Sequence, residues 1–297
     1  MEIRIRTLTP LGTGGGDQTC DRLHETGIIG SLRWWYEALV RGLGGYACDS
    51  TGDDRCEYDP KKPVPPENQL CAACHLFGCT GWGRKFRLRV LDTSGQVIQN
   101  AVHENTEMVF EFVEVRPIGP EEKWLLTKAI EIAAKYGALG GKTTYKPQKG
   151  PMGKDFGIVE WVGASDISRP ADVKAILKNF RNVQHLPEYP NLAHFFFFLG
   201  AFLSRVQMNP LLGLDNKGKP LSKTDEVEKF LQGKRGSAQS EAVSKKLFSF
   251  QADGGRIWGY AKEIAMRNQI VDRIKQQLQL GKVSYTVKVG EEVIHEL

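Results

Sequence analysis

The chain has 297 residues, of which 41% are hydrophobic and 25% are charged. It can therefore bury a substantial core, and this composition excludes an intrinsically disordered chain. The 40 basic and 35 acidic side chains leave a net charge of +5, a mild excess that favours an anionic partner without identifying one.

The longest apolar run extends from Phe195 to Leu203. It is far shorter than the roughly 20 residues that a membrane-spanning helix needs, and the opening residues show no secretory signal pattern. We therefore expect a cytoplasmic protein, whose cysteines are reduced or bound to metal rather than paired in disulfides.

In the first half of the sequence, hydrophobic residues recur with the period of a strand or of a helix in turn. Alternation indicates a strand, and steps of three and four residues indicate a helix. The expected elements are a strand at 3–8, a helix at 28–43, strands at 86–90 and 107–115, a helix at 121–136 and a strand at 156–162. This βαββαβ order is typical of a ferredoxin-like domain.

The sequence thus predicts an α+β fold with two domains. Residues 1–165 are expected to form the ferredoxin-like domain, with a cysteine-rich insertion at about 44–83. Residues 166–297 are expected to form a helix-rich second domain, and the sequence leaves open whether it is a degenerate second ferredoxin-like unit. Its expected helices lie at 171–183, 192–206, 225–232 and 260–280, with short strands near 247–250 and 283–289.

Five of the six cysteines lie in or beside the insertion. Cys71 and Cys74 have the two-residue spacing of a zinc knuckle, and Cys48 and Cys56 precede them. Four thiolates suit a structural Zn²⁺, which would hold together a proline-rich segment with few apolar residues. Cys79 and His75 remain alternative ligands, and buried free thiols remain an alternative to a metal site.

A loop rich in glycine and lysine follows the second expected helix, from Gly137 to Gly157. Glycine lets a backbone approach an anion closely, and lysine neutralises phosphates without reading base sequence. The loop therefore favours phosphate contacts, although a solvated surface loop would have the same composition. The four lysines concerned are Lys142, Lys146, Lys149 and Lys154.

Further basic residues extend this predicted nucleic-acid surface. Alternation along the second strand is expected to put Lys85, Arg87 and Arg89 on one face of the sheet. Arg33 is expected in the first turn of its helix, where it and the helix N-terminus would grip one phosphate together. The remaining candidates are Arg22, Lys234, Arg235 and Arg256.

Aromatic residues provide candidates for stacking on nucleic-acid bases. Trp34 is predicted to stack on a base, whereas Trp35 is expected in the core. Trp258 and Tyr260 suit either role.

Candidate catalytic residues are few and lie after the first strand. They are Asp17, Asp21 and His24. A histidine with a pKa near neutrality can deprotonate a ribose 2′-hydroxyl, but no second histidine or activated nucleophile lies nearby in the sequence. A surface or hydrogen-bonding histidine is the more common arrangement.

Two motifs resemble those of a known family. A glycine-rich stretch, Gly12 to Gly16, precedes Gly30-Ser31-Leu32-Arg33-Trp34-Trp35. This pattern is similar to the start of RAMP proteins, the ferredoxin-like RNA-binding subunits of CRISPR systems. The double tryptophan, together with the segment from Cys74 to Trp82, more narrowly resembles RAMP subunits of the type III-B (Cmr) effector complex. The resemblance covers roughly residues 1–160.

The resemblance implies a non-catalytic subunit that helps to hold guide RNA towards its 3′ end, beside other RAMP subunits, in a complex that cuts target RNA through a different subunit. It also implies that the loop from Gly137 to Gly157 contacts phosphates. In cutting RAMP subunits a catalytic aspartate follows the first strand, where Asp17 and Asp21 lie here. Two alternatives remain, an endoribonuclease that uses His24 or Asp21 and a purely structural assembly subunit.

Overall fold

The computed structural model describes residues 1–13, 22–49, 54–140, 155–165, 167–183, 190–233, 244–279 and 284–297. These residues form two four-stranded antiparallel sheets with helices packed against them. No helix among them is long and apolar enough to cross a membrane.

The first unit follows the predicted element order. Its elements are β1 (Glu2–Thr7), α1 (Glu25–Gly42), the short helices α2 (Pro66–Gln69) and α3 (Ala72–Phe77), β2 (Phe86–Leu91), β3 (Glu107–Glu114), α4 (Pro120–Tyr136) and β4 (Val159–Ala164). The strands lie in the order β2-β3-β1-β4, each pair antiparallel. The predicted βαββαβ succession is therefore present, with α2 and α3 between the first helix and the second strand.

Strand alternation gives the first sheet one buried and one exposed face. Ile3 and Ile5 of β1 and Phe110 and Phe112 of β3 are fully or almost fully buried beneath α1 and α4. Alternate residues such as Arg4 point to the other face, which is open to solvent. This is the pattern expected of an antiparallel sheet that is covered by helices on one side only.

The second unit contains a sheet that the sequence did not predict in full. Its elements are α5 (Val173–Leu177), a 3₁₀ turn at Leu192–His194, β5 (Phe195–Leu199), α6 (Arg205–Leu211), α7 (Glu226–Gln232), β6 (Leu247–Phe250), β7 (Arg256–Tyr260), α8 (Ile264–Gln279), β8 (Thr286–Val289) and α9 (Gly290–His295). The order β6-β7-β5-β8 repeats the order β2-β3-β1-β4 of the first sheet. The predicted strands near 247–250 and 283–289 are present.

The helix predicted at 192–206 is wrong, because Phe195–Leu199 is the strand β5. All four phenylalanines of this strand are fully buried. Phe195 and Phe197 pack into the core shared with the first unit, and Phe196 and Phe198 pack into the core under α6, α7 and α8. A strand buried on both faces reads as a continuous apolar run, which periodicity cannot distinguish from a buried helix.

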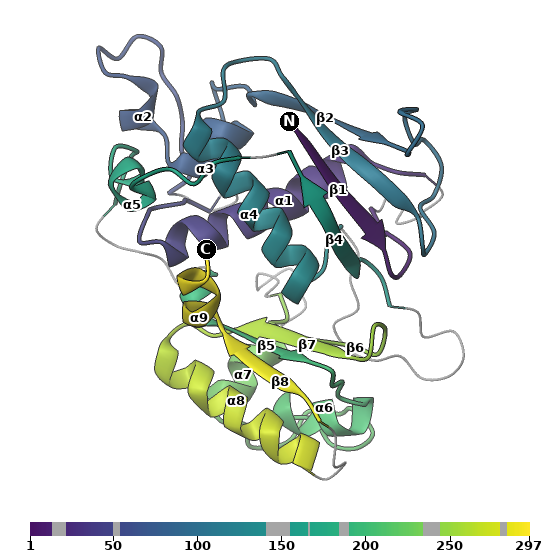
Figure 1. Ribbon diagram of the computed structural model, residues 1–297. Helices are drawn as coiled ribbons and strands as arrows, with labels where there is room; N and C mark the ends of the chain where they lie inside the picture. Colours follow the sequence, from purple (N-terminus) through teal and green to yellow (C-terminus); the bar gives the residue numbers. More distant parts are fainter. Residues whose placement is uncertain are drawn as a thin grey trace.

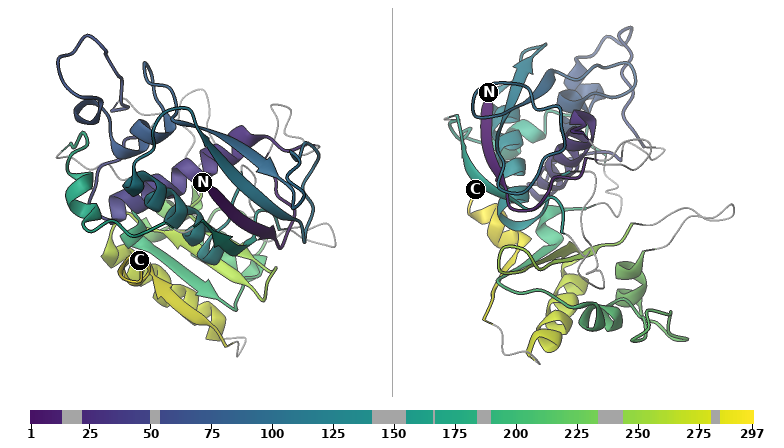
Figure 2. Two further views of the ribbon diagram at one scale, coloured as in Figure 1. Left: turned by 45° about the horizontal axis from the view of Figure 1, so that its top comes forward. Right: turned by 90° about the vertical axis from the view of Figure 1, so that its right-hand side faces the viewer.

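The two units stack so that α1 and α4 lie between the two sheets (Figure 1). Trp35 contacts both Phe195 and Trp258, with ring centroids 5.7 and 5.2 Å apart, and Tyr136 contacts Phe197 at 5.1 Å. The Trp35 ring lies so close to Gly137 that a Cβ there would clash with it. The successive layers are sheet, helices, sheet and helices, as Figure 2 also shows.

Arg256 joins the two units through hydrogen bonds. From β7 its Nη1 donates to the carbonyl oxygens of Ala134 and Gly137, each at 2.9 Å, at the end of α4. A buried cation at this position satisfies carbonyls that the helix itself leaves unpaired and complements the helix dipole. Arg256 is 5% exposed, so the prediction that it contacts RNA on a basic surface is wrong.

Replacing Arg256 should therefore destabilise the protein. Arg256→Met leaves two buried carbonyls without their donor, and we expect the free energy of unfolding to fall by about 2–4 kcal/mol. Arg87→Met, at an exposed position of β2, is the matched control and should change it by less than about 0.5 kcal/mol. Urea unfolding followed by tryptophan fluorescence measures both. Equal stability of the two variants would contradict the role of Arg256.

Candidate functional site: a thiol cluster and an aromatic pocket

Four cysteines converge in the segment between α1 and β2. The sulfur atoms of Cys48, Cys56, Cys71 and Cys74 all lie within 4.8 Å of one another, and all four residues are buried. Cys48 Sγ is 3.4 Å from Cys74 Sγ and 3.8 Å from Cys71 Sγ. Four sulfurs around a tetrahedral metal ion at ~2.3 Å would lie ~3.8 Å apart. The donor set and its spacing therefore fit a structural metal ion, and they are the four cysteines that the sequence predicted.

Nitrogen hydrogen-bond donors surround the sulfur atoms of the cluster. Arg33 Nη2 is 3.2 Å from Cys74 Sγ, and Arg181 Nη1 is 3.4 Å from Cys56 Sγ. The backbone N–H of Cys74 also donates to Cys71 Sγ at 3.4 Å. Hydrogen bonds among the thiols lower the pKa of Cys56 and raise the pKa of Cys71 and of Cys74. Two guanidinium groups would also offset part of the negative charge of a four-thiolate metal site.

Neither alternative ligand belongs to the cluster. His75 uses Nδ1 for Glu122 Oε1 at 2.8 Å, its Nε2 lies 3.3 Å from Glu67, and its ring stacks on Trp82. Cys79 is half-buried, and its thiol lies 3.6 Å from the Thr80 carbonyl and also interacts with Cys74. It is not one of the four cysteines whose sulfurs lie within 4.8 Å of one another.

The thiol cluster also explains the position of Arg33. Its Nε donates to Glu37 at 2.7 Å and its Nη1 to the Gly78 carbonyl at 2.9 Å. Because α1 begins at Glu25, Arg33 lies beyond the first turn. The expectation that Arg33 and the helix N-terminus grip one phosphate together is therefore wrong.

Lys85 is likewise buried and forms an ion pair inside the protein. Its ammonium is 2.8 Å from Glu122 Oε2, and both side chains are buried. Burial alone would raise the pKa of Glu122, but hydrogen bonds from His75 and Lys85 outweigh burial and lower it. Arg87 and Arg89 lie on the exposed face of the sheet as predicted, but Lys85 precedes the strand and does not share that face.

The exposed face of the first sheet is not uniformly basic. Arg89 pairs with Glu111 at 2.9 Å across β2 and β3. Arg6 pairs with both Glu107 and Glu160, at 3.0 and 3.2 Å. Carboxylates from the adjacent strands therefore compensate much of the positive charge that the strand sequences indicate.

A second candidate site is an aromatic pocket where the two units meet. It has a volume of about 340 Å³, and Trp34, Trp258, Tyr260 and Phe248 contribute rings to its wall. Phe248 stacks on Trp258 with centroids 4.1 Å apart, and Trp34 lies 6.0 and 5.9 Å from Trp258 and Tyr260. Ser31, Trp35, Ala138, Gly140, Ser244 and Lys245 complete the lining.

The pocket also contains polar groups, among them the side chains of Ser31, Ser244 and Lys245. Trp258 Nε1 is buried and has no hydrogen-bond partner among the described residues. Burial raises the pKa of Tyr260 to about 12, so its hydroxyl stays neutral at physiological pH. Flat aromatic walls beside polar groups suit a planar ring such as a nucleobase. The sequence identified Trp34, Trp258 and Tyr260 as stacking candidates but missed Phe248, because nothing in the sequence indicates that β6 faces α1.

The remaining predicted residues are exposed or lie outside the described residues. Arg22 is exposed beside Asn100, and His24 is the residue before α1, where its side chain makes no capping bond. The residues that lie outside the described part are Asp17, Asp21, Lys142, Lys146, Lys149, Lys154, Lys234 and Arg235. The structure therefore does not test the predicted phosphate contacts of the loop.

Comparison with protein families decides the identity of the first unit. The model of the RAMP superfamily matches residues 4–145. Residues 4–145 therefore belong to the RAMP superfamily. This match covers nearly all of β1 to α4 and includes the thiol cluster. The first unit, β1 to β4, is called the RAMP domain from here on, and the aromatic pocket lies where it meets the second unit.

Two solved structures are similar over nearly the whole chain. Cmr1 from Pyrococcus furiosus, in its apo form, is 13% identical over 96% of this chain and 97% of that chain, with a TM-score of 0.48. A chain of the type III-B Cmr-beta complex bound to cognate target RNA and AMPPnP is 10% identical over 93% of this chain and 98% of that chain, with a TM-score of 0.51. The second likeness shows a shared fold. Comparison with curated proteins gave no significant match.

The thiol cluster predicts the metal content of the purified protein. Purified without a metal-affinity column, the protein should contain about one bound transition-metal ion per chain by elemental analysis. Cys71→Ser removes one ligand and should lower both the metal content and the melting temperature. Cys79→Ser is the matched control and should leave both unchanged. Wild-type protein that is free of metal yet equally stable in the presence of a chelator would contradict this prediction.

Proposed function

We propose that this protein is a non-catalytic, RNA-binding subunit of a type III-B CRISPR effector complex. It would correspond to the first-numbered RAMP subunit of that complex. In this role it holds guide RNA towards the 3′ end in the cytoplasm, next to other RAMP subunits and close to target RNA. The RAMP match over residues 4–145 and the fold shared with a chain of an RNA-bound Cmr complex support this assignment.

The observation that carries the proposal is the aromatic pocket between the two units. Its lining includes Ala138 and Gly140, at the start of the glycine- and lysine-rich loop. A base stacked against Trp34 would place its phosphate next to this loop, where lysines neutralise the backbone. Stacking and charge neutralisation together give RNA affinity without a requirement for base sequence.

We also propose that residues 1–165 and 166–297 are ferredoxin-like domains, and that the four cysteines of the first bind a structural Zn²⁺. The repeated strand order supports the first part. Zn²⁺ is the ion best suited to four buried thiolates in tetrahedral geometry. The ion would hold the segment between α1 and β2 together and takes no part in chemistry on RNA.

The first test is a titration with labelled single-stranded RNA at several salt concentrations, with each sample also run on a denaturing gel. We expect affinity to fall steeply with salt while the RNA remains intact. RNA shortened by wild type but not by His24→Ala or Asp21→Ala would show an endoribonuclease instead. An absence of binding at low salt would favour a purely structural assembly subunit.

Replacing Trp34 tests the pocket. Trp34→Ala removes one stacking surface and should weaken RNA binding about tenfold, since stacking contributes about 1–3 kcal/mol per base. Trp161→Ala, which removes another half-buried tryptophan from β4, is the control and should bind RNA as wild type does. A second variant, Ser31→Leu, fills the pocket without removing an aromatic ring and should also weaken binding. Unchanged affinity in both pocket variants would exclude the pocket as the RNA site.

Reversing the charge of two loop lysines tests the proposed phosphate contacts. The double variant Lys142→Glu, Lys146→Glu should weaken binding and lower the slope of log affinity against log salt by about 1.4, because each contact with a single strand contributes about 0.7. Lys217→Glu and Lys219→Glu, in an exposed turn of the second unit, form the control pair. An equal decrease in both pairs would indicate an effect of net charge alone.

A further inference from the structure

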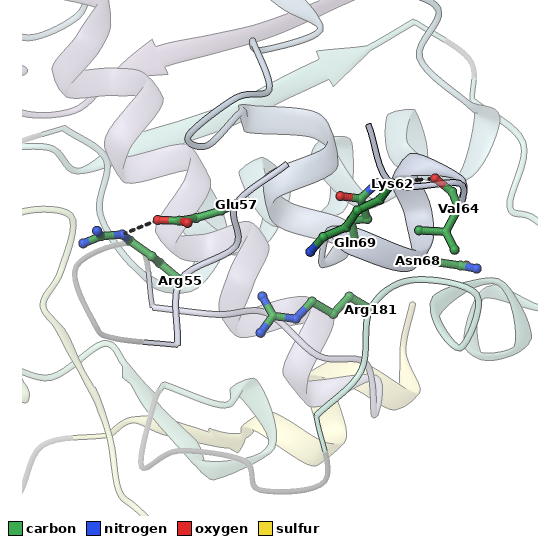
Figure 3. A pocket seen from close by; sticks show the side chains of 7 residues that line it. All are labelled: Arg55, Glu57, Lys62, Val64, Asn68, Gln69 and Arg181. Atoms are coloured by element: carbon green, nitrogen blue, oxygen red, sulfur yellow. Dashed lines mark hydrogen bonds and ion pairs between the residues drawn. The ribbon is translucent and has the colours of Figure 1, made fainter. Parts of the chain in front are cut away.

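A cavity in the described part of the chain lies beside the thiol cluster. It has a volume of about 570 Å³ and is open to solvent. One wall is the segment from Arg55 to Gln69, and the other is Arg181, which follows α5 in the second unit (Figure 3). The lining of this cavity contains no cysteine of the thiol cluster and no residue of the aromatic pocket.

Two cations converge on the cavity. Figure 3 shows the ammonium of Lys62 and the guanidinium of Arg181 directed into the same space. Within the described ranges, neither group forms an ion pair with a carboxylate. The one acidic residue of the lining, Glu57, lies 3.5 Å from Arg55 on the far side. Like charges that face one another across a cavity favour an anion between them.

The surrounding hydrogen bonds hold Arg181 in place. Its backbone N–H donates to the carbonyl oxygens of Glu67 and Leu70, at 2.7 and 3.0 Å. Its Nη1 donates to Cys56 Sγ, which leaves Nη2 for a ligand. A guanidinium fixed in this way loses little conformational entropy when it binds an oxyanion.

Gln69 holds the loop that carries Lys62. The Gln69 Oε1 accepts a hydrogen bond from the backbone N–H of Asp59 at 3.0 Å, and the Gln69 Nε2 donates to the carbonyl oxygens of Asp59 and Val64. Gln69 is buried, so these bonds are shielded from water. Asn68, also in the lining, supplies a neutral amide. The cavity thus combines one guanidinium nitrogen, an ammonium group and an amide.

We propose that this cavity binds a phosphate group of a nucleotide, either free or within a strand. Guanidinium, ammonium and amide donors match the oxygens of a phosphate. The volume leaves room for the attached nucleoside, and Val64 is the one apolar side chain of the lining, which disfavours an apolar ligand. The site is distinct from the aromatic pocket and does not depend on the proposed function.

Calorimetric titration of the full-length protein with AMP and with adenosine tests this site, because the two probes differ only in the phosphate. We expect AMP to bind and adenosine to bind at least tenfold more weakly. Lys62→Glu should weaken AMP binding about tenfold or more, whereas Lys61→Glu, an exposed neighbour outside the lining, should change it less than twofold. Arg181→Gln, with metal content checked, should weaken it similarly.

Equal binding of AMP and adenosine, or equal effects of Lys61→Glu and Lys62→Glu, would overturn the proposal, as would an absence of AMP binding to wild type. Competition by single-stranded RNA distinguishes the source of the phosphate. Displacement of AMP identifies a phosphate of the strand, and no displacement identifies a free nucleotide. Trp34→Ala should leave AMP binding unchanged, so failure at this site and failure of the proposed RNA pocket can be told apart.

Discussion

The structure depends on the burial of both faces of strand β5. Phe195 and Phe197 pack against the helices of the RAMP domain, while Phe196 and Phe198 form the centre of the second core. Complete burial of an aromatic side chain is among the largest favourable contributions that one residue can make to folding. Because this strand belongs to both cores, the second sheet is held against α1 and α4. That packing also creates the pocket between Trp34, Trp258 and Phe248.

Several cations that the sequence offers for RNA are used inside the protein. Arg33 contacts the thiol cluster, Lys85 pairs with Glu122, and Arg256 holds the end of α4. A buried cation requires a partner to offset its lost hydration, and each of these has carbonyl, carboxylate or sulfur partners. The modest positive net charge of the chain therefore overstates the charge available on its surface in the parts described.

Sequence patterns predicted the structure correctly where a local pattern is compatible with only one kind of element. Alternation in β1 and β3 and the helical steps of α1 and α4 predicted the RAMP domain, and cysteine spacing predicted the four clustered thiols. The sequence failed where the answer depends on distant partners. It could not separate a doubly buried strand from a helix at Phe195–Leu199, nor reveal that Glu122 partners Lys85, because 37 residues separate them. For the same reason the sequence does not indicate that Arg181 and Lys62 line the same cavity.

The layered arrangement has a consequence for the order in which the chain acquires structure during synthesis. The helices α1 and α4 end at Gly42 and Tyr136, so both leave the ribosome well before Phe195 does. The RAMP domain can close its own sheet with local partners, and its helices then present a ready apolar surface. Among the described residues 167–183 and 190–194, which precede it in its own unit, strand β5 has no comparable surface. The packing is therefore consistent with assembly of the second sheet on the helices of the first unit.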